Sequence, residues 1–158
     1  GITDSMLQAE GVSKRDAAAA FSALLVHPNT LLVAYNAQFD LCFLYYFLAR
    51  QKQANILQGV KLLDAMTVYK DRHDYPHKLC NAIETYGLQG QNTHRAIDDV
   101  KATLELLDAM ATEEDDLAQY VNLFGYHPKY GVSGPRISSV TYRPQGYERH
   151  QKLYQFLP

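Results

Sequence analysis

The chain has 158 residues, of which 47% are hydrophobic and 20% charged, and its formal net charge is −2. This length and composition predict one compact domain with a buried core, and the overall charge does not indicate a strongly basic nucleic-acid-binding protein. The longest apolar run, LCFLYYFLA at residues 41–49, is too short to cross a bilayer. We therefore expect no insertion into a membrane.

Apolar periodicity predicts the following elements in chain order: a helix at residues 14–25, a strand at 31–35 (LLVAY), a helix at 39–51, a strand at 60–64 (VKLLD), and helices at 65–72, 78–86 and 95–111. Gly87 is expected to end the helix at 78–86 as its C′ residue. Both strands have the short apolar character of strands buried on both faces. The alternation predicts an α/β fold with parallel strands.

The C-terminal part of the chain has a different pattern. Residues 113–125 (EEDDLAQYVNLFG) predict one more helix, and ISSVTY at 137–142 alternates as an isolated strand would. Prolines and glycines around that strand indicate turns.

Cys42 and Cys80 fall in apolar helical contexts and have no partner at a spacing typical of zinc sites. We expect both to be buried free thiols. Free thiols are typical of a reducing compartment and favour a cytoplasmic location.

Charge is unevenly distributed along the chain. Residues 1–125 hold ten Lys and Arg against sixteen Asp and Glu, a net charge of −6, while residues 126–158 hold five against one, a net charge of +4. We therefore divide the chain into a domain at 1–125 and a basic, tyrosine-rich extension at 126–158. An acidic domain is compatible with cation binding, although a merely solvated acidic surface is the commoner explanation.

Two adjacent aspartates in the helix predicted at 95–111 face different ways. Asp99 falls within the apolar stripe, whose other members are Ala96, Val100, Thr103, Leu104, Leu107 and Met110. Asp98 lies on the polar side, with Lys101, Glu105 and Asp108. A lone inward carboxylate is costly unless it is paired, hydrogen-bonded or bound to a metal. The alternative is that Asp99 stabilises the helix N-terminus through the helix dipole.

A second carboxylate, Asp40, follows the strand at 31–35, and α/β sheets hold their ligands at the carboxyl ends of strands. Its alternative role is an N-terminal cap, for which Asn36 competes. His94, five residues before Asp99, is by itself most simply a loop residue or a cap. Two inward carboxylates and a histidine together indicate a metal-dependent hydrolase site.

These residues lie in two recognisable motifs. YNAQFDLCFL at 35–44 and HRAIDDVKAT at 94–103 resemble the second and third motifs of the DEDDh 3′-to-5′ exonucleases, the family of the DNA polymerase III epsilon subunits. GITDSML at 1–7 resembles the end of the family's His-Gly-Ile-Thr segment. The resemblance covers residues 1–111 and implies an RNase H-like fold. The family's first motif, Asp-x-Glu, is absent, so we expect the central mixed sheet to lack its first strands.

The resemblance implies two divalent cations, Mg²⁺ or Mn²⁺, with His94 as the general base. Asp99 would ligate metal directly, and Asp40 would support the metal site directly or through water. It also implies four substrate-binding residues, Ile2, Thr3, Tyr35 and Asn36. Tyr35 stands where the family often has histidine, so a secondary substrate contact is expected to differ.

The implied substrates are the 3′ ends of single-stranded DNA or RNA, and a DNA polymerase is a further implied partner. An upstream segment or another chain would complete the sheet. The alternative function is a degenerate exonuclease fold that binds nucleic acid or a polymerase without cutting. A phosphatase on another α/β scaffold is a weaker interpretation, because Asp64 ends its strand alone and is most simply a helix cap.

The extension at 126–158 interleaves basic residues with tyrosines, a pattern that favours contact with nucleic acid. The alternative is that ISSVTY pairs with a sheet edge or a second subunit.

Overall fold

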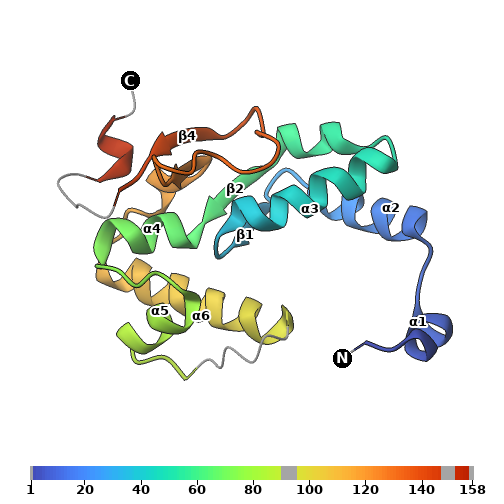
Figure 1. Cartoon of the computed structure of the whole chain (residues 1–158), viewed down its shortest axis with the longest axis horizontal. Helices are drawn as coiled ribbons and strands as arrows, with labels where there is room; N and C mark the ends of the chain where they lie inside the picture. The colour runs from blue at the N-terminus through green and yellow to red at the C-terminus, as the bar shows by residue number, and fades with distance from the viewer. Residues whose placement is uncertain (1, 90–95, 147–151, 157–158) are drawn as a thin grey trace.

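The computed structural model describes residues 2–89, 96–146 and 152–156 (Figure 1). The elements along the chain are α1 (Asp4–Glu10), α2 (Lys14–Leu25), β1 (Leu31–Ala34), α3 (Ala37–Arg50), β2 (Lys61–Asp64), α4 (Ala65–Arg72), α5 (Leu79–Thr85), α6 (Ala96–Glu113), β3 (Leu123–Tyr126) and β4 (Thr141–Pro144). Short 3₁₀ helices form at η1 (Ala54–Gly59), η2 (Leu117–Tyr120) and η3 (Leu153–Phe156). No helix within these residues is both long enough and apolar enough to pass through a bilayer.

The strands form two parallel pairs that lie edge to edge. In one pair Leu31 is opposite Lys61, and in the other Leu123 is opposite Thr141. Asn122 joins the pairs: its backbone N–H donates to the Leu62 carbonyl at 2.7 Å, and its side-chain oxygen accepts from the Leu62 N–H at 2.8 Å. Asn122 has a positive φ of 59°, a conformation that asparagine tolerates better than most residues.

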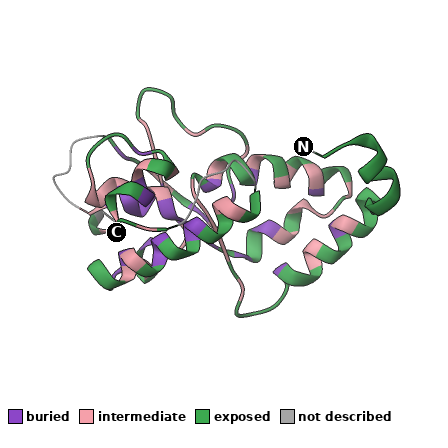
Figure 2. Cartoon of the chain, turned by 90° about the horizontal axis from the view of Figure 1, so that it is seen from below, coloured by how far each residue is buried: buried purple, intermediate pink, exposed green. Residues whose placement is uncertain are grey.

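Helices cover both faces of β1 and β2, and each face has its own hydrophobic core. Leu62 belongs to the core that α2 and α3 complete, and Leu63 belongs to the core of α4, α5 and α6. Successive residues of a strand point to opposite faces, so one short apolar strand contributes to both cores. The buried residues lie in the interior between these helices (Figure 2).

The first helix, α1, stands apart from this body (Figure 1). All its residues are exposed, and Thr3 caps it by accepting a hydrogen bond from the Met6 N–H at 3.3 Å. The sequence interpretation did not include this helix.

Most predicted elements are confirmed. The helices α2 and α4 have the expected bounds, α3 begins two residues earlier than expected, and β1 and β2 are parallel. Gly87 follows α5 with a φ of +61°, and the Leu88 N–H reaches back to the Ile83 carbonyl at 3.0 Å. That is the C-terminal motif for which glycine is favoured.

The prediction of a helix at 113–125 is wrong. The helix α6 ends at Glu113, and the following residues form η2 and β3. The strand predicted at 137–142 lies instead at Thr141–Pro144, and it is not isolated, because it pairs with β3. Pairing with a neighbouring strand overrode the local helical pattern. The division between residues 125 and 126 stays a prediction, and β3 runs across it.

The expectation of two buried thiols is wrong for Cys80, which is exposed, and Cys42 is only partly buried. Both are free cysteines. On α5 the buried side chains are Ala82 and Ile83, so the short helix turns Cys80 toward solvent.

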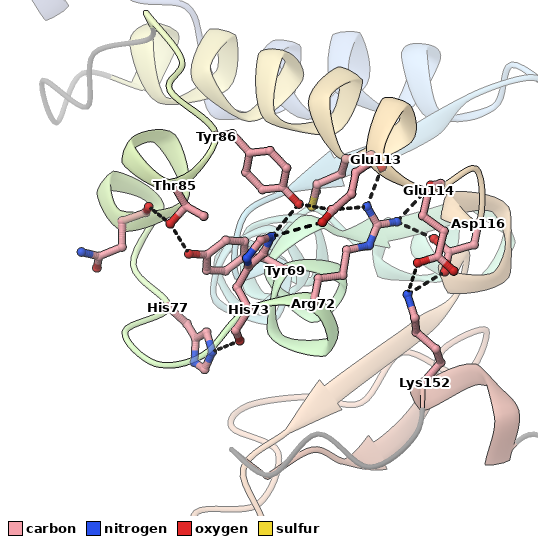
Figure 3. A network of polar contacts seen from close by, with 12 residues as sticks. Tyr69, Arg72, His73, His77, Thr85, Tyr86, Glu113, Glu114, Asp116 and Lys152 are labelled. Carbon is pink, nitrogen blue, oxygen red and sulfur yellow. Dashed lines mark hydrogen bonds and ion pairs between the residues drawn. The ribbon is translucent and has the colours of Figure 1, made fainter.

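A polar network fastens the end of α4 to the end of α6 (Figure 3). The Arg72 side chain is only 3% exposed. It donates to the carbonyl oxygens of Met110 and Glu114 and to the carboxylates of Glu113 at 3.1 Å and Asp116 at 2.5 Å. Lys152 also contacts Asp116, at 3.3 Å, and brings the C-terminal residues onto the same cluster.

This network predicts a loss of stability in acid. Burial alone would raise the pKa of Asp116, but hydrogen bonding and charge attraction from Arg72 outweigh it and hold the pKa below the usual range. Glu113 likewise has a lowered pKa, because Tyr86 and Arg72 outweigh its burial. A lowered folded-state pKa stabilises the fold above the unfolded-state values of about 3.9 and 4.3. That stability is lost as pH falls through the folded-state values.

Urea unfolding at pH 7 and at about pH 3 checks this prediction. Arg72→Met should be less stable than the original protein at pH 7, and its stability should fall less between the two pH values. An equal fall in both proteins would contradict the assignment.

Candidate active site

A cleft of about 710 Å³ opens where β1 ends, beside the start of α3 and the start of α6. Four residues predicted to form the site line it together, namely Tyr35, Asn36, Asp40 and Asp99. They come from segments about sixty residues apart in the chain, and the cleft lies at the carboxyl end of a parallel strand, where α/β proteins bind ligands.

The turn between β1 and α3 is held by a buried carboxylate, Asp64, at the end of β2. One of its oxygens, Oδ1, accepts hydrogen bonds from the backbone N–H groups of Asn36 at 2.9 Å, Ala37 at 3.1 Å and Met66 at 3.1 Å. The other, Oδ2, accepts from the Thr67 hydroxyl at 2.9 Å. Burial raises the pKa of Asp64, and these four hydrogen bonds oppose the rise.

The interpretation of Asp64 as the cap of the following helix is confirmed by its bond to Met66. The bonds to Asn36 and Ala37 give it a second role that the sequence did not show, because they fix the first turn of α3. Asn36 there adopts a left-handed conformation, with φ 64° and ψ 51°. Asn36 occupies the N-cap position, but its side chain makes no capping hydrogen bond among the described residues.

Asp40 lies inside the first turn of α3, so it is not the N-cap of that helix. The residue is exposed, but neighbouring groups desolvate its carboxyl group and raise its pKa, and a hydrogen bond from its own backbone opposes the rise. A raised pKa means that the ionised carboxylate is stabilised less than in water. A cation in the cleft would restore that stabilisation.

Asp99 lies in the first turn of α6 and is half-buried. Its Oδ1 atom is buried, and none of the described residues donates a hydrogen bond to it. The nearby Thr103 hydroxyl donates to the Asp99 backbone carbonyl at 2.7 Å and not to this carboxylate oxygen. A buried carboxylate oxygen without a donor is costly unless another ligand compensates it.

The predicted inward stripe of α6 is only partly correct. Thr103, Leu107 and Met110 are buried as expected, and Ala102 and Leu106 join them. Ala96, Val100 and Leu104 are exposed and line the cleft instead, because no described element covers that side of the helix. Asp99 thus stands where the packed face of α6 meets the cleft. Asp98 is half-buried and is not among the residues that line the cleft.

The Tyr35 hydroxyl donates to the His77 backbone carbonyl at 3.0 Å. Burial, followed by the nearby Tyr69 and Asp64, raises the pKa of Tyr35, so its phenol stays protonated. His77 and Lys78 also line the cleft. Sequence reasoning missed both, and the only signal for them is a pair of basic residues within an acidic region.

Three predicted site residues are not placed in the cleft. Ile2 and Thr3 are exposed at the start of α1 and do not line it. His94 lies outside the described residues. Among the residues that the structure does describe, no three His, Cys, Asp or Glu side chains gather closely enough to hold a metal ion.

Comparison with known families decides the class of this site. A family model described as an exonuclease, RNase T, matches residues 1–107. The chain belongs to this exonuclease family. Its mixed α/β architecture with short parallel strands is consistent with an exonuclease domain. No curated protein and no solved structure matches the chain.

The part matched to the exonuclease family contains the whole lining of the cleft, from Leu32 to Leu104. The strands β3 and β4 lie outside it. Family membership therefore assigns nuclease chemistry to the protein, and the cleft is its candidate active site.

Proposed function

We propose that this exonuclease hydrolyses phosphodiester bonds stepwise from the 3′ ends of DNA or RNA, as DNA polymerase III epsilon subunits do. The observation that carries the proposal is the meeting of Asp40 and Asp99, from α3 and α6, in one cleft. Carboxylates at the end of a strand, open to a space large enough for a nucleotide, fit a phosphodiester hydrolase.

Two divalent cations, Mg²⁺ or Mn²⁺, would be held there by Asp40 and Asp99. Carboxylate oxygens are the ligands these ions prefer. The buried Asp99 Oδ1 that accepts no hydrogen bond from the described residues fits a ligand atom, and so does the desolvated carboxyl of Asp40. When bound, the cations neutralise the scissile phosphate and stabilise the attacking and leaving oxygens.

His94 is the proposed general base, which accepts a proton from the attacking water. It precedes Asp99 by five residues, and the unperturbed pKa of histidine, about 6.5, leaves much of it neutral near pH 7. Tyr35 and Asn36 would contact the terminal nucleotide from the cleft wall. Ile2 and Thr3, which do not line the cleft, are also proposed to contact this nucleotide.

His94→Ala is expected to lower turnover by about 10² to 10⁴ without weakening metal binding. The measurements are single-turnover nucleotide release and calorimetric titration with Mn²⁺. If the variant loses Mn²⁺ affinity in parallel with turnover, His94 is a metal ligand and its assignment as the base fails.

We also propose that a further strand pairs with β1 and completes the site. Among the described strands, β1 is hydrogen-bonded only to β2. Three apolar side chains that line the cleft beside β1 are exposed, namely Phe39, Val100 and Leu104. Asp40 and Asp99 supply two negative charges against the four positive charges of two cations, so the strand would carry further carboxylates. It would come from an upstream segment or from another chain.

The second candidate function is a module that binds nucleic acid or a DNA polymerase without cutting. It is favoured by the lack of a three-residue metal-binding group within the described part of the chain. Incubation of a 5′-labelled single strand with Mg²⁺ or Mn²⁺ separates the two. Stepwise shortening from the 3′ end supports the exonuclease. Binding without shortening, in a preparation that includes the completing strand, supports the module.

A further inference from the structure

Residues 127–136, here called the basic loop, follow β3 and pass along α3 (Figure 1). A tight turn forms its first half: the N–H groups of Tyr130 and Gly131 both donate to the His127 carbonyl at 3.0 Å. Gly131 has a φ of +67°, which glycine adopts without strain. This turn holds Tyr130 outward with 74% of its surface exposed. The loop thus presents an aromatic ring to solvent on an ordered backbone.

The same turn presents positive charge. Lys129 lies over the Tyr130 ring, with its ammonium 5.4 Å from the ring centre. Arg136 lies over the ring of Tyr142 at 5.2 Å. Residues 126–146 contain no Asp or Glu. Neither Lys129 nor Arg136 forms an ion pair with any described residue, so both charges remain available to a ligand.

The other cations of the extension are used differently. Lys152 pairs with Glu114 and Asp116, and Arg143 is partly buried within β4. Arg149 and Tyr147 lie outside the described residues. Among the described residues of 126–158, the candidates for the expected nucleic-acid contact are therefore Lys129, Tyr130 and Arg136.

The basic loop is fastened beside the candidate active site. Gln38, in the first turn of α3, donates to the carbonyl oxygens of Ser133 at 2.6 Å and Pro135 at 2.9 Å. Its own side-chain oxygen accepts from the Tyr142 hydroxyl at 3.0 Å. Gln38 is two residues before Asp40, so one turn of helix carries both the loop contact and a cleft carboxylate.

The loop also leaves the sheet on the side where the cleft opens. Asn122 bonds to Leu62, and three residues later the Gly125 N–H donates to Thr67 at 3.0 Å, so β3 runs parallel to β2. The basic loop begins at the carboxyl end of β3, and the cleft lies at the carboxyl end of β1. A nucleic-acid strand whose end enters the cleft can therefore continue along the same edge of the sheet, past the basic loop.

We propose that the basic loop binds the single-stranded nucleic acid next to the nucleotide that enters the cleft. Lys129 and Arg136 neutralise backbone phosphates, and Tyr130 stacks on a base. The inference rests on the proposed function, because it assigns the loop to the substrate of the same cleft.

The test is fluorescence anisotropy with a 5′-fluorescein-labelled 12-mer of thymidylate, in Ca²⁺, at 50 to 200 mM NaCl. Each phosphate contact with a single strand contributes about 0.7 to the slope of log affinity against log salt. The wild type should therefore lose about sevenfold more affinity over this range than Lys129→Ala/Arg136→Ala, which lacks two contacts. Tyr130→Leu should weaken binding at least about fivefold, and Tyr130→Phe should retain it.

The matched control is Lys14→Ala/Arg15→Ala, which removes the same charge from exposed positions at the start of α2. It should keep the wild-type salt slope. A wild-type slope in Lys129→Ala/Arg136→Ala, an equal change in the control, or a wild type that does not bind the 12-mer would overturn the proposal. The assay measures binding alone, so a wild type that binds as expected but releases no nucleotide would contradict the proposed function and leave this inference standing.

Discussion

Asp99→Asn is expected to abolish metal-dependent nucleotide release, with a loss of about a thousandfold or more. The Asp99 carboxylate lines the cleft, and its buried Oδ1 accepts no hydrogen bond from the described residues. An amide keeps the shape of the side chain but removes the charge that we propose to hold a cation. A lost stabilisation of several kcal/mol corresponds to a change of this size. Single-turnover cleavage of a labelled strand in Mg²⁺ or Mn²⁺, by a preparation that includes the proposed completing strand, measures this loss.

Asp98→Asn is the matched control, since it makes the same chemical change one residue earlier on α6. Asp98 does not line the cleft, so its variant should retain most of the activity. Comparable losses in the two variants would withdraw Asp99 as the ligand. A fully active Asp99→Asn would remove the two-cation proposal altogether.

Asp64→Ala is expected to destabilise the protein by about 3 to 5 kcal/mol, because several donors lose their acceptor at once. Three backbone N–H groups and the Thr67 hydroxyl donate hydrogen bonds to Asp64, and all four would be left without this partner. Asp64→Asn should cost less, since its carbonyl oxygen can still accept the three N–H groups. Its amide nitrogen would meet a Thr67 hydroxyl that now donates to the carboxylate. Urea unfolding measures the free energy of unfolding of both variants and of the original protein.

Asp64→Ala should also weaken cation binding, because Asp64 fixes the turn that precedes Asp40. A suitable comparison is Asp71→Ala. Asp71 accepts from the Tyr120 hydroxyl at 3.0 Å, the Gln145 side chain at 2.7 Å and the Leu153 N–H at 2.6 Å, at the other end of α4. It should lose stability but keep Mn²⁺ affinity in the folded protein. Equal Mn²⁺ affinity in folded Asp64→Ala and in the original protein would mean that Asp64 acts on stability alone.

The sequence predicted the elements whose signal is local. Apolar spacing set the bounds of α2 and α4, and the short apolar runs marked β1 and β2. The face of α6 could not be derived in the same way, because Val100 and Leu104 are apolar but have no described element against them. Periodicity shows which side chains avoid water, and the neighbouring elements decide which of them are covered.

For the site, the positions of Asp40 and Asp99 followed from the strand end and the helical stripe, and the structure brings both to one cleft. The wider role of Asp64 could not be predicted, because it depends on register. Ala34 pairs with Asp64, which sets that carboxylate beside the turn that follows β1. His77 and Lys78 reach the cleft from a segment with no pattern of its own.

Thr67 links the candidate active site to the C-terminal part of the chain. Its hydroxyl donates to Asp64 and accepts from the Gly125 N–H at 3.0 Å, so the site is supported by residues beyond the matched family region, which ends at residue 107. Arg72 and Asp71 likewise find most of their partners after that residue. Transfer of only the family-matched region to another scaffold would move the cleft without the residues that hold Thr67, Asp71 and Arg72 in place. The smallest segment that keeps these contacts extends through β4 to Leu153.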